Sequence, residues 1–72
     1  MGFSQGRCLL KLRLAERHMS QSDLARKTGY SRQVISHYVH NRALMSPGVM
    51  RTIAHVLKCR MEDLYEWVWS DQ

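Results

Sequence analysis

The segment over residues 20–42, SQSDLARKTGYSRQVISHYVHNR, constrains the fold of this chain more than any other part. Ser20 is placed to accept a hydrogen bond from the backbone N–H of Asp23, as serine does at the start of a helix, and Asp23 then lies near the helix's positive end. Gly29 tolerates the left-handed conformation that ends many helices, because it lacks a Cβ atom. The sequence therefore predicts a helix over about 21–28.

A second helix is predicted directly after this turn. Ser31 repeats the capping residue type, and apolar residues then recur at the three- and four-residue spacing of one buried face. They are Val34, Ile35, Tyr38 and Val39. Asn41 lies where this helix must end, since asparagine tolerates the left-handed conformation well. Two capped helices of about eight to ten residues with a glycine turn between them form a helix-turn-helix pattern.

Two further helices are predicted toward the C-terminus. Ser46 is a suitable cap for a helix over about 47–57, and Pro47 fits its first position, where the missing N–H costs nothing. Its buried side would consist of Val49, Met50, Ile53, Ala54, Val56 and Leu57. A last helix over about 61–68 would place two acidic residues in its first turn and four apolar residues on one face. These apolar residues are Met61, Leu64, Tyr65 and Val68.

The start of the chain fits two interpretations. Residues 8–14 alternate with the period of a strand, whereas Leu10, Leu14 and the run LAERHM suit a helix. We expect a helix that ends near Arg17. In one interpretation a short extended segment over residues 7–10 precedes it and pairs with the WVW stretch near the C-terminus. The alternative is one continuous helix.

The segment SQSDLARKTGYSRQVISHYVHNR resembles the helix-turn-helix of transcriptional regulators of the Xre, Cro and lambda-repressor type. The serine-glutamine start, the Leu-Ala pair, the glycine turn and the Ser-Arg-Gln opening of the second helix carry this resemblance. SPGVMRTIAHVLKCRMEDLYEW in turn resembles the two helices that complete the family's domain. The resemblance implies an all-α, five-helix, lambda-repressor-like DNA-binding domain that occupies residues 1–72 as a single unit.

Length and charge agree with one small domain that binds an acidic partner. Seventy-two residues allow one core. All eleven Lys and Arg lie in residues 1–60 with only two carboxylates, whereas residues 61–72 hold four carboxylates and no base, which gives charges of +9 and −4. A positive surface attracts DNA phosphates, with an affinity that falls as salt rises. No apolar run approaches the roughly twenty residues of a membrane span, so we expect a cytoplasmic protein without membrane contact, of prokaryotic or phage origin by the resemblance.

The resemblance assigns roles to the polar residues of the motif. In this family the second motif helix lies in the major groove, and residues near its start reach base edges. Arg32 and Gln33 are the leading base contacts, since arginine suits guanine and glutamine suits adenine, and Ser36 and His37 follow one turn later. Contacts to phosphates are expected from Gln21, Ser31, His40, Asn41 and Arg42. The alternative for these side chains is a merely solvated polar face, with Ser31 acting first as a cap.

The tryptophans near the C-terminus predict a partner. On a helix that continues through residue 68, Trp67 and Trp69 would fall away from the buried face, and exposed aromatic side chains often form interfaces. A homodimer would let two recognition helices bind half-sites about 34–36 Å apart. A different protein could also bind this aromatic end. The alternative is a monomer in which one or both tryptophans cover the first helix.

No pattern predicts an enzyme, a cofactor or a metal site. The four histidines form no HExxH pattern, and Cys8 and Cys59 are too few and too far apart for a standard zinc site. The resemblance implies repression by occlusion of DNA. The rival function on the same fold is a protein-interaction module of the antitoxin or anti-repressor kind. The polar face of the second motif helix favours DNA.

One departure from the family pattern concerns the core. Many members carry an arginine seven residues before the motif glutamine, paired with a glutamate near the end of the recognition helix. The matching residues here are Leu14 and Val39. Loss of both charges together leaves two apolar side chains that can pack, whereas a single buried charge without its partner is costly.

Val39→Glu should therefore lower the melting temperature of the domain, because the new carboxylate would be buried without a cation. Thermal unfolding followed by circular dichroism measures the change. An unchanged melting temperature would contradict the packing of residue 39 in the core.

Overall fold

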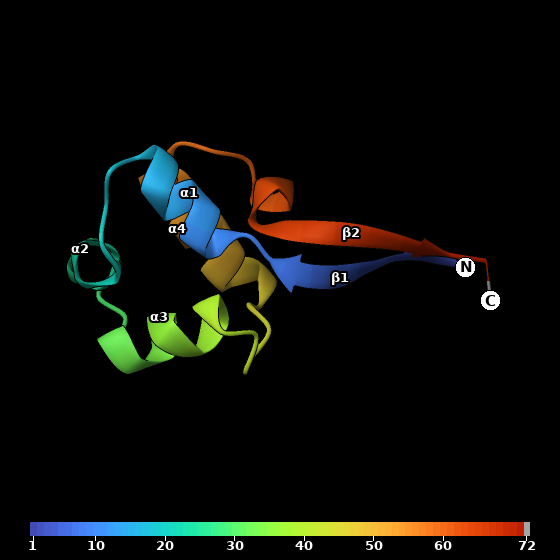
Figure 1. Cartoon of the computed structure of the whole chain (residues 1–72), viewed down its shortest axis with the longest axis horizontal. Coiled ribbons are helices and arrows are strands. Elements are labelled where there is room, and N and C mark those ends of the chain that lie inside the picture. Colours follow the sequence, from blue (N-terminus) through green and yellow to red (C-terminus); the bar gives the residue numbers. More distant parts are fainter. Residues whose placement is uncertain (72) are drawn as a thin grey trace.

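The helices gather at one end of the molecule, and a two-stranded ribbon projects from them (Figure 1). The computed structural model of the chain describes residues 1–71. Its elements are β1 (Gly2–Cys8), α1 (Leu10–Glu16), α2 (Gln21–Thr28), α3 (Arg32–Val39), α4 (Pro47–Leu57), the 3₁₀ turn η1 (Met61–Leu64) and β2 (Tyr65–Ser70). The molecule measures 40 × 21 × 19 Å. Within the described residues, every helix is too short or too polar to cross a membrane.

Serine caps begin α2, α3 and α4, as predicted. Ser20 Oγ accepts from the backbone N–H of Asp23 at 3.0 Å, and the Asp23 carboxylate accepts in return from the Ser20 N–H at 3.0 Å. The bond from the Ser20 backbone N–H, with a smaller effect of the Ser20 hydroxyl, lowers the pKa of the Asp23 carboxyl group. Ser31 and Ser46 each cap their helix through one backbone N–H, at 3.1 and 3.4 Å. Gly29 ends α2 with a φ of 81°, which confirms the predicted helix over 21–28.

The prediction of an all-α, five-helix fold is wrong. The helix expected over 61–68 is only the short turn η1, and the chain then extends as β2. Aromatic residues and valine, which dominate YEWVWS, favour a strand, and β1 supplies the backbone partner that such a strand needs. The four apolar residues that suggested a helix do have helical spacing, but Tyr65, Trp67 and Trp69 alternate with the period of a strand, and pairing with β1 decides between the two patterns.

β1 and β2 are antiparallel, and their register corrects the predicted pairing. Phe3 lies opposite Trp69 and Gln5 opposite Trp67, so the WVW stretch pairs with residues 3–5 and not with residues 7–10. The strand begins at Gly2 and ends at Cys8, and α1 then runs to Glu16, close to the predicted helix end. The first turn of α1 follows directly, which excludes one continuous helix at the N-terminus.

The register shifts between Gln5 and Cys8, where Gly6 crosses close to the other strand. A Cβ atom on Gly6 would lie 2.9 Å from the backbone oxygen of Glu66. Real Cβ atoms do not approach so closely, so the two strands need glycine at this position.

All four helices, η1 and the root of the ribbon contribute to one core. Its members are Cys8, Leu10, Leu14, Leu24, Ile35, Val39, Met45, Met50, Ile53, Ala54, Leu57, Leu64 and Tyr65. Leu14 and Val39 are both buried in it, so these two apolar side chains pack in the core as the sequence predicts. Val34, in contrast, is 39% exposed, although it was predicted on the buried face. Ile35 and Val39 set the inward direction of α3, and Val34 lies beyond its edge.

Two hydrogen bonds connect the ribbon root to the loop after α3. Asn41 Oδ1 accepts from the Cys8 backbone N–H at 2.9 Å. The Tyr65 hydroxyl accepts from the Met45 N–H at 3.0 Å, and burial raises the pKa of this hydroxyl, which keeps it neutral. Cys8 and Tyr65 lie opposite each other in the sheet. The last paired residues of the ribbon thus hold both ends of the loop from Asn41 to Met45.

Tyr65→Phe should destabilise the domain by about 1–3 kcal/mol, because the buried Met45 N–H would lose its acceptor. Urea denaturation measures the free energy of unfolding. Tyr30→Phe is the matched control, since the Tyr30 hydroxyl makes no hydrogen bond within residues 1–71. Equal stabilities for the two variants would show that the Tyr65 bond contributes nothing.

Candidate DNA-binding surface

The outer face of α3 carries the polar residues that the sequence selected as base contacts. α3 lies along one side of the helical body (Figure 1). Arg32 and Gln33 are exposed in its first turn. Gln33 and His37, four residues apart, share the face that points away from the buried Ile35. The first turn of α3 can therefore present the guanidinium group of Arg32 and the amide group of Gln33 to a partner outside the protein.

The remaining residues of this face are less exposed or less polar. Ser36 and His37 are half-buried, so they project less than the first turn. Val34 lies beside them with its methyl groups exposed. The spacing of apolar residues predicted Val34 on the buried face, because Val34 directly precedes Ile35 and lies four positions before Tyr38. The structure leaves it at the surface. The outer face of α3 thus combines polar groups with one apolar contact.

The residues predicted to contact phosphates lie at the start of α2, in the turn before α3 and in the loop after α3. Gln21 is the first residue of α2 and is half-buried. Ser31 is exposed at the start of α3, and its Oγ already accepts from the Val34 N–H, which leaves its hydroxyl hydrogen as a donor. His40 and Arg42 are exposed just after α3. All of them are therefore accessible, although Ser31 is first a helix cap.

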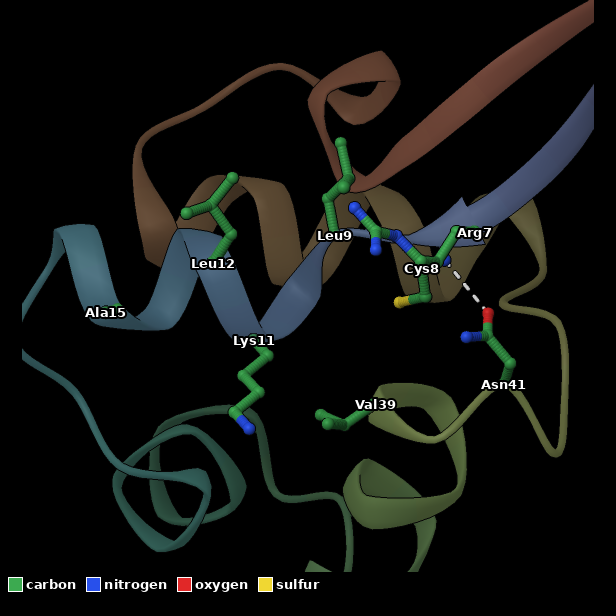
Figure 2. Close-up of a pocket in the computed structure, with 8 residues that line it drawn as sticks. All are labelled: Arg7, Cys8, Leu9, Lys11, Leu12, Ala15, Val39 and Asn41. Atoms are coloured by element: carbon green, nitrogen blue, oxygen red, sulfur yellow. Dashed lines mark hydrogen bonds between the residues drawn. The ribbon is translucent and has the colours of Figure 1, made fainter.

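Asn41 differs from the other predicted phosphate contacts because its side chain is part of the fold. Its φ of 60° confirms the left-handed turn that ends α3. Figure 2 shows its carbonyl oxygen aimed at the backbone of Cys8, with which it forms a hydrogen bond. Only the Asn41 Nδ2 group is left for an external contact. No sequence pattern predicts this bond, since Cys8 lies 33 positions earlier in the chain.

A shallow groove of about 490 Å³ runs from Asn41 to α1. It is lined by Arg7, Cys8, Leu9, Lys11, Leu12, Ala15, Val39 and Asn41. Figure 2 shows Lys11 directed from α1 toward the motif helices, so its ammonium adds positive charge on that side. Burial raises the pKa of the Cys8 thiol in the floor of the groove, which makes it a poor nucleophile.

The arginines of the chain differ in whether the fold already uses them. Arg13 and Arg17 serve the fold, because Arg13 Nε donates to the Asp63 carbonyl at 2.7 Å and Arg17 Nε donates to the Leu57 carbonyl at 2.8 Å. Arg32 and Arg42 form no ion pair within residues 1–71. Four of the six carboxylates lie in residues 62–71, at η1 and along the ribbon. Arg32 and Arg42, at the two ends of α3, are therefore free to meet phosphates, whereas the motif residue Arg26 is paired with Asp23.

The comparisons with known proteins agree with this geometry. Residues 10–70 match the family model of the Cro/C1-type HTH DNA-binding domain. A crystal structure of the transcriptional regulator VanUg is similar to this chain, with a TM-score of 0.71 and 21% sequence identity, and the alignment covers 97% of this chain and 92% of that one. At this level of identity the likeness establishes the fold. No curated protein sequence matches the chain.

Asn41→Gly should destabilise the domain by about 1 kcal/mol, because glycine keeps the left-handed turn but removes the acceptor for the Cys8 N–H. Asn41→Asp retains an acceptor oxygen and is the matched variant. We expect the aspartate variant to unfold at a higher urea concentration than the glycine variant. The reverse order would contradict a structural role for the Asn41 carbonyl.

Proposed function

The chain belongs to the Cro/C1-type HTH DNA-binding domain family, and we propose that it regulates transcription by reading the major groove of double-stranded DNA with α3. The observation that carries this proposal is the first turn of α3, where Arg32 and Gln33 are exposed and no carboxylate of the same helix competes for them. Side chains of this kind near the start of a recognition helix are those that reach base edges.

Arg32 and Gln33 are the proposed base readers. Arginine binds guanine through O6 and N7, and glutamine binds adenine through N6 and N7, and each bidentate pair is worth about 1–3 kcal/mol of discrimination. His37, on the same face as Gln33, and Ser36 would contact the bases one turn further on. The exposed methyl groups of Val34 suit the methyl group of thymine, so α3 would also make an apolar contact with the bases.

Gln21, Ser31, His40, Asn41 and Arg42 are the proposed phosphate contacts. They flank α3 at the start of α2, in the turn and in the following loop, so together they would fix the position of α3 in the groove without reading sequence. Asn41 would contribute through its Nδ2 group alone. Lys11, on the groove side of α1, would add to the long-range attraction.

We further propose that the protein is a cytoplasmic repressor that acts by occlusion and binds as a homodimer, with Trp67 and Trp69 at the interface. Both tryptophans are exposed, by 40% and 53%. They lie on the ribbon, away from α3, so a contact between copies there would leave the recognition helices free (Figure 1).

A protein-interaction module is the second candidate function. The exposed aromatic residues of the ribbon favour it, because apolar surface of this kind suits a protein partner better than DNA. The two functions differ in the part of the molecule that they use. A DNA-binding regulator depends on the polar face of α3, whereas a pure interaction module would tolerate changes there.

Gln33→Ala should relax the preference at one base pair and weaken specific binding by about 1–3 kcal/mol, with little change in non-specific binding. Selection of bound duplexes from a random library, followed by titrations at several salt concentrations, measures both quantities. His55→Ala, at an exposed position of α4, is the matched control. The absence of an enriched sequence, with binding lost near physiological salt, would contradict sequence-specific recognition and favour the interaction module.

A further inference from the structure

The groove between α1 and the end of α3 has an apolar floor that the proposed DNA contacts do not use. Five of its eight lining residues are apolar, namely Cys8, Leu9, Leu12, Ala15 and Val39. Leu12 is 51% exposed, so much of its side chain faces solvent. The groove has a volume of about 490 Å³, and neither tryptophan of the ribbon lines it. It is therefore an apolar surface separate from the one that the ribbon offers.

Two cations and an amide border this apolar floor. Figure 2 shows Lys11 directed from α1 toward the motif helices, and Arg7 lines the groove from the end of β1. Arg7 Nε lies 3.4 Å from a carboxylate oxygen of Glu66, which leaves the two terminal nitrogens of its guanidinium group as donors. Within residues 1–71, Lys11 forms no ion pair and no carboxylate lines the groove. The border is therefore positive, with the Nδ2 group of Asn41 as a further donor.

A ligand that matches the groove needs carboxylates next to apolar groups. The carboxylates would meet Lys11 and Arg7, and complementary charges at the border of an interface speed association and fix orientation. Apolar side chains would cover Leu12 and the floor, which removes apolar surface from water. A DNA phosphate meets only the first requirement, since its charged oxygens lose their hydration without gain when they lie on apolar side chains.

We propose that this groove binds an acidic, amphipathic segment of another protein. The groove is shallow and open to solvent, whereas a site for a small molecule encloses most of the ligand's surface. Amphipathic segments suit open grooves, because they lay a row of apolar side chains on the floor and keep their charges at the border. A segment with leucine-like residues on one side and carboxylates beside them satisfies both the floor and the two cations.

The segment must come from a different protein, because this chain has already used its own acidic stretch. Four of the six carboxylates lie among apolar residues in residues 61–71. In that stretch Leu64 and Tyr65 are buried in the core, and Glu66 is paired with Arg7 of the same chain. A second copy could offer this stretch as a ligand only by giving up its own ribbon and part of its core.

A segment bound in the groove would oppose DNA binding, and this consequence rests on the proposed function. Its carboxylates would neutralise the charge of Lys11 and compete with a phosphate for the Nδ2 group of Asn41. It would not cover Arg32 or Gln33, which lie in the first turn of α3, at the other end of the helix from the groove. The affinity for DNA would therefore fall without a change in base preference.

Selection of peptides from a random library displayed on phage, with the full chain as bait and without DNA, tests the groove. We expect enriched peptides that combine Asp or Glu with Leu, Ile or Phe, and whose affinity falls as salt rises. Lys11→Glu and Leu12→Ser should each raise the dissociation constant of these peptides by about tenfold or more, because one reverses a charge at the border and the other removes an apolar contact.

Arg51→Glu and Val68→Ser are the matched controls for these two variants. Both residues are exposed, and they lie in α4 and β2, outside the lining of the groove. The control variants make the same kinds of change in charge and in apolar surface, so they should bind the enriched peptides as the wild type does. Far-ultraviolet circular dichroism verifies that each variant remains folded.

The proposal is overturned if no peptide is enriched or if the enriched peptides lack acidic residues. Equal binding of the peptides to Lys11→Glu, Leu12→Ser and their controls would also overturn it, since the peptides would then bind elsewhere. Octanoate that binds the wild type as tightly as the peptides do would assign the groove to a small carboxylate amphiphile instead. Self-association of the wild type that Leu12→Ser abolishes, measured by sedimentation equilibrium, would assign it to a second copy.

Titration of a selected DNA duplex with and without an enriched peptide separates this inference from the proposed function. A wild-type chain that binds the peptides but no DNA contradicts the proposed function alone. A chain that binds DNA with sequence preference but enriches no acidic peptide contradicts the groove proposal alone. If both ligands bind, we expect the peptide to weaken DNA binding by the wild type and to have no effect on DNA binding by Leu12→Ser.

Discussion

The attachment of the ribbon to the loop after α3 determines the position of the ribbon relative to α3. The helical body could form its core without the outer half of the ribbon, but in the loop from Asn41 to Met45 only Met45 is buried. It is held at one end by the Asn41 side chain on the Cys8 backbone and at the other by the Tyr65 hydroxyl on Met45. Because this loop connects α3 to α4, its position also fixes where α3 ends.

Local chemistry explains the part of the fold that the sequence predicted well. The start of α2 depends on Ser20 and Asp23, which are three residues apart, and its end depends on Gly29, whose left-handed conformation needs no partner. Ser31 and Ser46 act in the same way. These signals involve neighbours in sequence, so the motif and the exposure of Arg32 and Gln33 followed from the residues alone.

The parts that were predicted wrongly depend on distant partners. The segment after Leu64 has a pattern that suits either a helix or a strand, and β1, more than fifty positions earlier, decides in favour of the strand. The structural role of Asn41 depends on the same strand, so the sequence offered only its turn-forming property. Val34 shows a smaller failure of the same kind, because the direction of the core around α3 is set by the helices that pack on it, chiefly α2, and not by α3 itself.

This division between local and distant determinants separates two properties of the proposed regulator. Base preference would depend on exposed side chains in the first turn of α3, whose start is fixed by the local cap of Ser31. Half-site spacing would depend on the ribbon, which reaches α3 only through the loop after it. A substitution at the tip of the ribbon can therefore change how two copies are spaced without changing which bases each copy contacts. Substitutions of Cys8 or Tyr65 cannot change the spacing alone, because both residues belong to the core as well as to the sheet.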